Sequence, residues 1–574
     1  MGNASPEPAF ATLTAGGALL VRLKAVGVDY IFCNSGTDFP PIIEGLAEAA
    51  AKDVPLPKAL VIPHESAAMG MAHGYYLATG RSQAVIAHTN VGLANCAIGA
   101  INAAVERVPV LLFSGRTPTT EKDRFGARTV PIGWGQEMRD QTALVREASK
   151  WDYELRFPEQ VVEMVDRAWA IANSTPRGPV YVSLPREVLC ETTPADGLDA
   201  PPLMQPAVAY PNPKQIAGAA SILAKAENPV IFAQHGTGSA EAFEALSTLA
   251  DEWGIPVCQY WALALAIPTD HPMAAEANPA KLIERADAIL VLDALAPWSP
   301  QIHRPKDGCA VIQIGQDPLS ARTPVRNFRS DLSIACDVAD GILALKGAMD
   351  ELRPGQAGIR AQRRDAVAAE NAQAREKILA AAEAGRDGAM TREWVSLCLS
   401  RALDGNDATI VSELGCPMAP LTLNHHRAWY QEPHAGGLGW SFPAALGMQL
   451  AERDRLIVAT MGDGSYMFSN PVACHQIAEA LDLSILVLVV NNAEWGAVRQ
   501  SVLGVYPDGY AARTNVMPLT QLSPVPDFTK VAEASRAWAR RVEDGAALPA
   551  ALGEALGHVR ARRGLALLDV RVRP

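Results

Sequence analysis

Short apolar runs rich in β-branched residues alternate with Ala-rich amphipathic stretches along the whole chain. In the first third, strand-like runs occupy residues 30–33, 58–62, 83–88 and 108–115, and helical patterns such as 65–80 lie between them. This alternation predicts βαβ units and therefore parallel sheets.

The same pattern returns twice further along the chain. Strand-like runs of the second and third groups lie at residues 228–234, 287–294, 309–315, 409–413, 455–464, 484–492 and 565–572. We therefore predict an α/β protein of three doubly wound parallel-sheet domains.

Two stretches without strand patterns separate these groups. Residues 191–215 are rich in proline and predict a surface linker, and residues 351–388 are charged and Ala-rich and predict a connecting helix. The predicted domains are then 1–190, 216–350 and 389–574. A chain of 574 residues is too long to fold around one hydrophobic core, which agrees with several domains.

The charge and the cysteines narrow the class of protein. A net charge of −12 without Lys/Arg clusters argues against a nucleic-acid partner, because phosphate binding needs a positive field. The nine cysteines form no CxxC pair, which is typical of a reducing compartment. We see no signal peptide and no apolar run long enough to span a bilayer, so we expect a cytoplasmic protein without a membrane partner.

Small oxygen-bearing residues flank one βαβ unit of the third group. The strand predicted at 455–461 leads into Gly462, Asp463 and Gly464, and the next strand ends at Asn492. Parallel strands end at the same sheet edge, so Asp463 and Asn492 can converge, and their oxygens suit Mg²⁺. Because glycines let backbone N–H groups approach an anion, the pattern predicts a magnesium-diphosphate site. "GDG" by itself also fits a capped turn.

The helix between these two strands has its own start signal. Pro471 is the predicted first helical residue, with Ser469 or Asn470 as its cap. We expect Val472 and Ile477 on its apolar side.

The spacing of GDG, 26 residues and NN resembles the signature of thiamine diphosphate (ThDP) enzymes. The segment "GGLGWSFPAALGMQLAERDRLIVATMGDGS" (436–465) is similar to that of benzoylformate decarboxylase and its relatives, and it lacks the insert after "GGLG" of the acetolactate synthase type. The resemblance continues through 491–500. It implies a pyrimidine-binding, a middle and a diphosphate-binding domain, in that order.

The resemblance assigns a metal site. It implies that Asp463, the Asn492 side chain and the backbone carbonyl of Glu494 bind Mg²⁺. Trp495 matches a residue that lines the pocket in relatives.

The resemblance also assigns the residues that contact the diphosphate. Gly464 and Ser465 match backbone and hydroxyl contacts near it. Gly415 and Cys416 stand where relatives often have hydroxyl residues, so we expect backbone N–H contacts there.

Two residues of the "GGLG" segment match contacts to the cofactor rings. The carbonyl of Gly436 matches the acceptor for the 4′-amino group, and Leu438 matches the bulky residue that bends ThDP into a V shape. Leu438 could equally be an ordinary core leucine.

Glu65 matches the essential glutamate of the family. The resemblance implies that it hydrogen-bonds the pyrimidine N1′ and favours the imino tautomer, after which the ylide attacks a 2-keto carbonyl and CO₂ leaves. By itself, Glu65 could be an acid favoured by a helix dipole. "HESAAMGMAH" is not a zinc motif, because Ala68 occupies the position of the second histidine.

His88 and Thr37 match active-site positions of benzoylformate decarboxylase. The resemblance implies a proton-relay role for His88 and a substrate-carboxylate contact for Thr37. His88 could instead be structural, and Thr37 with Asp38 could simply shape a turn. His64 and His434 are alternative proton sources, each more often a structural residue.

The second active-site histidine of the relative has no clear match. It falls near Pro300, and His303 is close in sequence but out of register. In the same domain, "HGTGSAE" (235–241) starts like a dinucleotide fingerprint, but Glu241 replaces the third glycine. Middle domains of this family bind FAD or no nucleotide, and we expect none here.

The resemblance implies a ThDP- and Mg²⁺-dependent 2-keto acid decarboxylase with carboligase activity in addition. The alternatives are an acetolactate synthase-type carboligase, an acyloin or 2-hydroxyacyl carbon–carbon lyase that acts without decarboxylation, and a silent cofactor-binding subunit. The substrate would be a small 2-keto acid or aldehyde. We expect a homodimer or homotetramer with the active site at the subunit interface.

Overall fold

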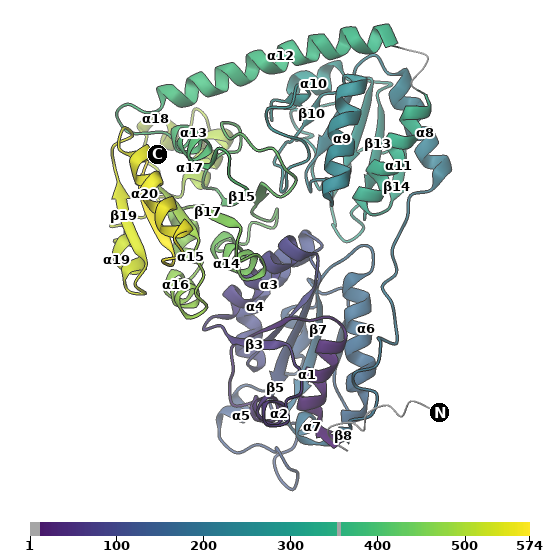
Figure 1. Cartoon of the computed structure of the whole chain (residues 1–574), viewed down its shortest axis with the longest axis vertical. Helices are drawn as coiled ribbons and strands as arrows, with labels where there is room; N and C mark the ends of the chain where they lie inside the picture. Colours follow the sequence, from purple (N-terminus) through teal and green to yellow (C-terminus); the bar gives the residue numbers. More distant parts are fainter. Residues whose placement is uncertain (1–11, 353–356, 574) are drawn as a thin grey trace. The chain divides into compact units, whose positions relative to one another are not determined.

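The computed structural model describes residues 12–352 and 357–573, which form three six-stranded sheets whose strands are all parallel (Figure 1). Helices lie between most successive strands in the sequence, as βαβ units require. The predicted fold class is confirmed. Each sheet has its own buried apolar core.

The first sheet has the strand order β3-β2-β4-β5-β7-β6. Its strands are β2 (Tyr30–Cys33), β3 (Lys58–Val61), β4 (Gln83–Ala87), β5 (Val110–Arg116), β6 (Asp152–Glu154) and β7 (Val180–Pro185). Its helices are α1 (Ala15–Ala25), α2 (Pro40–Ala51), α3 (Glu65–Thr79), α4 (Thr89–Val105), α5 (Ile132–Gly135), α6 (Val161–Asn173) and α7 (Arg186–Cys190). Short strands β1 (Thr12–Thr14) and β8 (Thr192–Pro194) pair antiparallel, so the predicted linker begins with a strand.

The second sheet has the strand order β11-β10-β9-β12-β13-β14. Its strands are β9 (Pro229–Ala233), β10 (Val257–Cys258), β11 (Ala274–Ala275), β12 (Ala288–Leu292), β13 (Ala310–Gly315) and β14 (Leu332–Ala335). Its helices are α8 (Pro213–Lys225), α9 (Ala240–Trp253), α10 (Ala280–Arg285) and α11 (Val338–Glu351).

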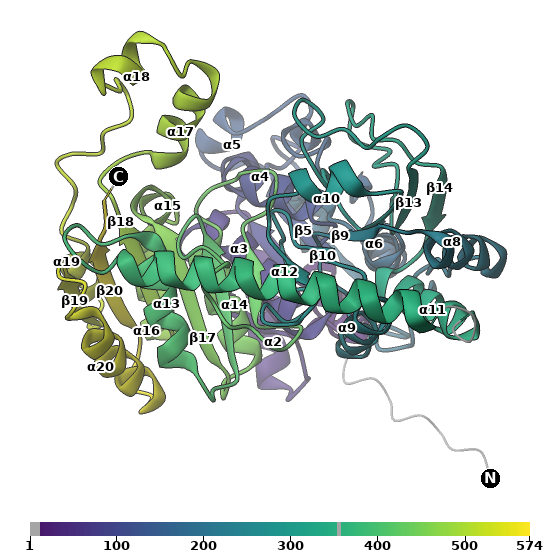
Figure 2. The same ribbon diagram turned by 90° about the horizontal axis from the view of Figure 1, so that it is seen from above.

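The predicted connecting helix is α12 (Ala357–Ala384), which is followed by α13 (Arg392–Leu403). It contacts α9 beside the second sheet and α13 beside the third, and Figure 2 shows it running between these two groups.

The third sheet has the strand order β16-β15-β17-β18-β20-β19. Its strands are β15 (Ala408–Glu413), β16 (Trp429–Gln431), β17 (Leu456–Gly462), β18 (Leu486–Asn491), β19 (Trp538–Val542) and β20 (Ala566–Arg571). Its helices are α14 (Ser441–Ala451), α15 (Asp463–Phe468), α16 (Pro471–Ala480), α17 (Gly496–Val505), α18 (Tyr510–Thr514), α19 (Phe528–Glu533) and α20 (Leu548–Arg560).

The chain divides into two compact units. The first unit combines the described part of 1–207 with 433–453, and the second combines 208–432 with the described part of 454–574. The second and third sheets therefore belong to one unit, while α14 belongs with the first sheet. The predicted domain boundaries stay a prediction.

Glycines bring α14 close to α3 within the first unit. A Cβ added at Gly74 would lie 1.9 Å from the carbonyl oxygen of Ala444, and one at Gly447 would lie 2.1 Å from that of Met71. Such distances are impossible for real side chains, so this helix pair requires glycine at both positions. The packing fixes the middle of α3 against α14.

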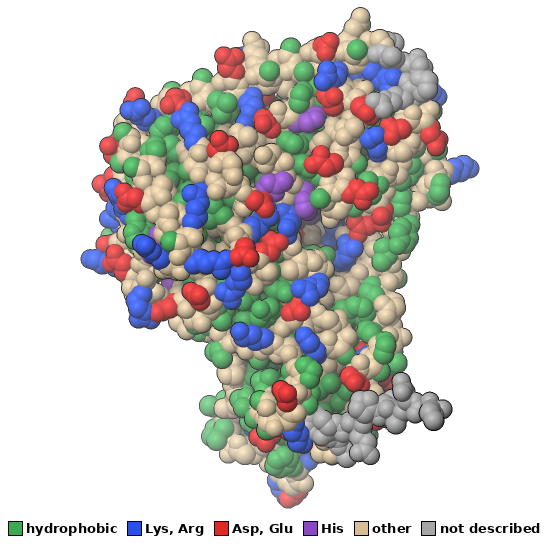
Figure 3. All heavy atoms as spheres, viewed as in Figure 1, with side chains coloured by type: hydrophobic (Ala, Val, Ile, Leu, Met, Phe, Trp, Pro, Cys, Tyr) green, Lys and Arg blue, Asp and Glu red, His purple; other side chains and the backbone are tan. Residues whose placement is uncertain are grey.

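Charged side chains of both signs are interspersed on the face drawn in Figure 3. Exposed ion pairs of the chain include Arg285 with Glu370. Exposed ion pairs contribute little to stability, so the buried carboxyl groups are of greater interest. None of the described helices is long and apolar enough to cross a membrane.

Candidate functional site

The predicted turn after β17 is a short helix. The structure begins α15 at Asp463, directly after the strand ends at Gly462. Pro471 is the first residue of α16, as predicted, and Asn470 is its cap position with φ 53° but no capping side-chain hydrogen bond. The prediction for Val472 was wrong, because this side chain is 61% exposed, whereas Ile477 is buried.

Asp463 and Asn492 follow the ends of two adjacent parallel strands. Gly462 in β17 is in register with Val490 in β18, and β18 ends at Asn491. The backbone N–H of Ala493 is close enough to the Asp463 carboxylate to lower its pKa. The predicted convergence at this sheet edge is therefore present.

The Asp463 carboxyl group is buried and incompletely paired. It is 2% exposed, and its Oδ2 has no hydrogen-bond partner among residues 12–352 and 357–573. Burial raises the pKa of Asp463 to about 6, although nearby backbone N–H groups act in the opposite direction. An orphaned buried carboxylate oxygen fits a bound cation, which would compensate the cost of burial.

The two other candidate metal ligands are partly occupied. Asn492 Oδ1 accepts the N–H of Glu494 at 3.1 Å, and the Glu494 carbonyl accepts the N–H of Gly496 at 2.8 Å. Each of these oxygens retains a second lone pair. The Glu494 carboxylate accepts from the Thr520 hydroxyl at 2.6 Å and from Arg499 at 3.1 Å. Its side chain is thus engaged elsewhere, which leaves the backbone carbonyl as the group for a metal.

Trp495 lies directly against the first turn of α15. A Cβ added at Gly464 would lie 2.2 Å from the Trp495 ring, so only glycine fits there. The ring meets Phe468 edge-on at 5.8 Å between centroids. Ser465 is buried in the same turn. The aromatic ring therefore covers the turn that begins at Asp463.

Gly415 and Cys416 follow β15, the other neighbour of β17. A Cβ at Gly415 would lie 2.4 Å from the Thr460 backbone, and the Cys416 N–H donates to the Thr460 hydroxyl at 3.3 Å. Burial raises the pKa of the Cys416 thiol to about 12, so it is neutral. Leu414 adopts φ 54°, a strained conformation for leucine.

A buried carboxyl pair beside this loop escaped the sequence reasoning. Glu413 is fully buried, and Glu432 is 8% exposed and accepts the N–H of Leu414 at 3.3 Å. Burial and the charge of Glu413 raise the pKa of Glu432 to about 8. The Glu432 carboxyl therefore keeps its proton to a higher pH than an exposed glutamate does. No sequence motif marks it.

Glu65 is the first residue of α3 and is 5% exposed. Asn34 donates its amide to Oε1 at 2.9 Å, and Asn95 donates its amide to Oε2 at 3.0 Å. A Cβ added at Gly92 would lie 2.9 Å from Oε1, so α4 approaches the carboxylate closely. The sequence reasoning missed both asparagines, although Asn34 directly follows β2 at the same sheet edge.

His88 lies at the end of β4, where its ring contacts a carboxylate. Its Nδ1 forms a short hydrogen bond with Asp38 Oδ1, and its Nε2 lies 3.1 Å from the Gln136 amide. The hydrogen bond to Asp38 raises the pKa of His88 more than burial lowers it. Asp38 is therefore a partner of His88 and not only part of a turn.

The contacts of Thr37 and of the alternative histidines are mainly structural, unlike those of Glu65 and His88. Thr37 is exposed, and its carbonyl accepts Arg186 at 3.2 Å. His64 caps α3 through Nδ1. His303 Nδ1 accepts the N–H of Ser299 at 3.3 Å, and the His434 backbone N–H donates to a Glu106 oxygen at 3.0 Å.

The "GGLG" segment is fixed to α4 by one asparagine. Asn102 donates to the Gly437 carbonyl at 2.8 Å and accepts the Gly437 N–H at 3.2 Å. Gly436 adopts φ 67°, which favours glycine. Leu438 is only partly buried and belongs to none of the apolar clusters. That position suits a contact residue better than a core leucine.

The glycines of "HGTGSAE" make the turn into α9. Gly236 and Gly238 adopt φ 70° and 76°, and Ser239 caps the helix by accepting the N–H of Ala242. His235 Nδ1 lies 2.5 Å from the Asp293 carbonyl. These contacts account for the motif as a structural turn.

A cavity of about 900 Å³ opens within the second unit beside the loop after β15. Its walls include Leu414, Cys416 and Met418 of that loop, and Tyr260 and Trp261 of the segment after β10. Trp261 adopts φ 49°, a strained conformation for a bulky residue. A volume of this size accommodates a small organic molecule.

Comparison with known families gives three matches that together span more than half of the chain. Residues 13–144 match the thiamine pyrophosphate enzyme N-terminal TPP binding domain, 216–345 match the central domain, and 414–570 match the C-terminal TPP binding domain. These ranges contain Glu65 and His88 in the first match and Asp463 and Asn492 in the third.

Relatives along the whole chain have several activities. A probable 2-ketoarginine decarboxylase of Pseudomonas aeruginosa is 26% identical over 93% of this chain and 90% of its own length. An acetolactate synthase of Mycobacterium bovis is 25% identical over 91% and 82%. The benzoylformate decarboxylase of Pseudomonas aeruginosa is 26% identical over 83% and 85%.

A solved structure shares the fold. The ThDP-dependent 4-hydroxybenzoylformate decarboxylase of Rhodococcus jostii superposes with a TM-score of 0.77 at 23% identity. The match covers 98% of this chain and 99% of that one.

Proposed function

Because the chain belongs to the family of thiamine pyrophosphate enzymes, we propose that it is a ThDP- and Mg²⁺-dependent 2-keto acid decarboxylase similar to benzoylformate decarboxylase. The buried Glu65 carboxylate carries this proposal, because its two oxygens accept amide donors and its position is therefore fixed. Decarboxylases among the relatives support it.

The residues at the edge of the third sheet fit the cofactor. Asp463 Oδ2, Asn492 Oδ1 and the Glu494 carbonyl would bind Mg²⁺, which takes few protein oxygens and completes its shell with phosphate oxygens and water. The backbone around Gly415 and Gly464 would contact the diphosphate. Bound ThDP supplies an electron sink for the pair released when CO₂ leaves.

Glu65 would act on the pyrimidine ring through a hydrogen bond. Asn34 and Asn95 hold its carboxylate in one orientation, so little reorganisation is needed when the proton moves. The Gly436 carbonyl would accept from the amino group of the same ring, and Leu438 would contact the cofactor.

His88 would donate and accept protons at the substrate. The imidazole is half-buried, and its Nε2 side lies beside Gln136 and not in the apolar core. Thr37 is exposed nearby and would contact the substrate carboxylate.

A carboligase of the acetolactate synthase type is the second candidate. Acetolactate synthases match the chain over a similar share of its length. Cleavage or formation of an acyloin bond without decarboxylation uses the same residues. For each reaction we expect a cytoplasmic homodimer or homotetramer. Light scattering on the purified chain would measure the number of subunits.

The experiment is a screen of 2-keto acids for CO₂ release, with and without an aldehyde acceptor. Benzoylformate, pyruvate and 2-ketoarginine would be tested with ThDP and Mg²⁺ and with each omitted. Release of CO₂ with an aldehyde product supports the decarboxylase. An acyloin or acetohydroxy acid as the main product supports the carboligase, and no turnover of any substrate contradicts both.

A further inference from the structure

The carboxylate of Asp38 is fully used by its immediate neighbours. Its Oδ1 contacts His88 Nδ1, and its Oδ2 accepts the N–H of Thr89 at 3.2 Å. Asp38 is 4% exposed, and Thr89 adopts φ 39°, a strained conformation that directs its N–H toward Asp38. The pair is therefore enforced by the fold around it.

Two glycines provide the space for this pair. A Cβ added at Gly36 would lie 2.1 Å from Nδ1 of His88, and one added at Gly115 would lie 1.5 Å from Oδ2 of Asp38. Any side chain at either position would displace the imidazole or the carboxylate. Gly36 precedes α2 and Gly115 belongs to β5, so two separate elements provide space for the same pair.

The opposite side of the imidazole faces Gln136, which follows α5. The Gln136 amide nitrogen lies 3.1 Å from Nε2 of His88. A rotated amide would present its oxygen to the same atom. Gln136 can therefore donate to a free Nε2 or accept from a protonated one.

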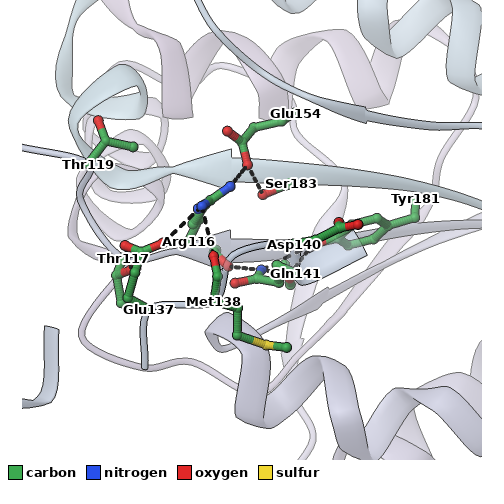
Figure 4. A network of polar contacts seen from close by, with 12 residues as sticks. Arg116, Thr117, Thr119, Glu137, Met138, Asp140, Gln141, Glu154, Tyr181 and Ser183 are labelled. Atoms are coloured by element: carbon green, nitrogen blue, oxygen red, sulfur yellow. Dashed lines mark hydrogen bonds and ion pairs between the residues drawn. The ribbon is translucent and has the colours of Figure 1, made fainter. Parts of the chain in front are cut away.

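The residue after Gln136 fixes this segment to the sheet. The Glu137 carboxylate accepts from Arg116 at 2.8 Å and from the Thr117 hydroxyl at 2.9 Å, and it pairs closely with Arg128. Figure 4 shows Arg116 and Thr117 pointing toward Glu137, with Arg116 also bonded to Glu154. This network holds Gln136 against His88.

Two carboxylates act on the imidazole, and two arginines line a cleft nearby. Asp38 contacts the ring, Glu65 acts on the ring at longer range, and Arg128 and Arg186 line a small cleft that Gln136 also borders. The nearest charge is the Asp38 carboxylate. It favours the protonated ring.

We propose that Asp38 and Gln136 are positioning residues that make His88 a two-state proton shuttle. Asp38 keeps a proton on Nδ1, and Gln136 rotates its amide to match Nε2 with or without its proton. In one cycle the Nε2 proton passes to the reacting molecule and the ring changes from charge +1 to 0. A water molecule then returns a proton to Nε2 and leaves hydroxide to the bulk solvent, so one proton is taken up from solvent in each cycle. The transfer of the proton to a substrate rests on the proposed function, whereas the effect of Asp38 and Gln136 on the protonation of His88 does not.

The test measures the titration of His88 directly. Diethyl pyrocarbonate modifies neutral imidazole, so the rate of His88 modification against pH, read by peptide mass spectrometry, gives its titration midpoint. We expect Asp38→Asn to lower the midpoint by about one unit, because an opposite charge is removed. We expect Gln136→Glu to raise the midpoint, because a second carboxylate would favour the charged ring.

Asp140→Asn is the matched control. Asp140 is half-exposed, lies near Gln136 in sequence and pairs with Arg146, so its removal changes the charge equally without contacting His88. Circular dichroism and thermal melting check that each variant folds, and Gln136→Glu remains informative if Asp38→Asn does not fold. A midpoint that moves down with Asp38→Asn, up with Gln136→Glu and not with Asp140→Asn supports the proposal. An unchanged midpoint in either of the first two variants, provided that it folds, overturns it.

The measurement needs neither substrate nor cofactor. If the chain released no CO₂ from any 2-keto acid, the proposed function would fail while the His88 titration could still give the expected shifts. Conversely, normal turnover with unshifted midpoints would overturn the positioning roles alone. For an active enzyme, the pH profile of kcat should shift in the same directions as the midpoints.

Discussion

Two small sets of buried carboxyl groups, one in each compact unit, differ in their hydrogen-bond partners. In the first unit, Glu65, Asp38 and Asp166 each have hydrogen-bond partners for both oxygens. At the edge of the third sheet, Asp463 has an oxygen without a partner, and burial raises the pKa of Asp463 and of Glu432.

The difference separates two kinds of chemistry. Carboxylates whose orientation is fixed by neighbouring donors suit proton transfer, because the charge and the geometry are set before a substrate arrives. A carboxylate that lacks a partner in a buried position is destabilised until a cation reaches it. In the proposed function, the first unit would supply the acid–base groups, and the second would supply the charge that binds the metal.

Removing the fixed acid should have the largest effect. We expect Glu65→Gln to lower kcat by more than about 10³-fold. This is in the upper half of the range of about 10²–10⁴-fold for a general acid–base group, because activation of the cofactor would also depend on Glu65. Turnover of the best substrate in saturating ThDP and Mg²⁺ measures this. Glu48→Gln is the control, since Glu48 forms only a partly exposed pair with Lys52. Equal turnover of Glu65→Gln and the wild type would sink the mechanism.

The buried ion pair of Asp166 with Arg22 in the first unit should show how much stability is lost when a fully paired carboxylate is removed. Asp166 binds Arg22 with two hydrogen bonds of 2.6 Å, and both side chains are fully buried. Asp166→Asn leaves the guanidinium without its counter-charge, so we expect a loss of about 3–5 kcal/mol in unfolding free energy. Urea unfolding measures it. A loss below about 1 kcal/mol would show that the buried pair is not needed.

Removal of the Glu432 carboxyl should instead raise stability at high pH. The pKa of Glu432 is raised by burial to about 8 in the folded chain against 4.5 for the free side chain. Below pH 4.5 both states are protonated, and as the pH rises toward 8 only the unfolded state loses its proton, so this group makes stability fall.

Glu432→Gln should remove this loss. The variant should match the wild type at pH 4.5 and exceed it at pH 9, by on the order of 3 kcal/mol. Thermal melting of both proteins across this range measures the difference. Parallel curves would show that Glu432 is ionised in the folded state.

Strand periodicity predicted most of the three sheets. The strongly apolar runs of β2, β9 and β18 were recognised because continuous burial leaves a continuous apolar pattern. The strands β6, β10, β11 and β16 were missed, since two or three residues carry too little pattern. The longer strands β7, β14 and β19 were missed as well. The helix α15 was missed because it begins inside the glycine turn.

The site could be predicted only where a motif or a strand end marks it. Asp463 and Asn492 follow strand ends, so their convergence follows from parallel pairing. The partners of Glu65 and His88 come from distant elements: Asn95 lies one helix away, and Gln136 lies 48 residues beyond His88. Such contacts depend on tertiary packing, which a single sequence does not display.

The proposed function places metal binding and acid–base chemistry in different units. Calorimetric titration of ThDP into the wild type, Glu65→Gln and Asp463→Asn, each with and without Mg²⁺, tests it most directly. We expect Mg²⁺-dependent binding of similar affinity for the wild type and Glu65→Gln, and at least about tenfold weaker binding for Asp463→Asn, which is 1.4 kcal/mol. Unchanged Mg²⁺-dependent binding by Asp463→Asn would contradict the account.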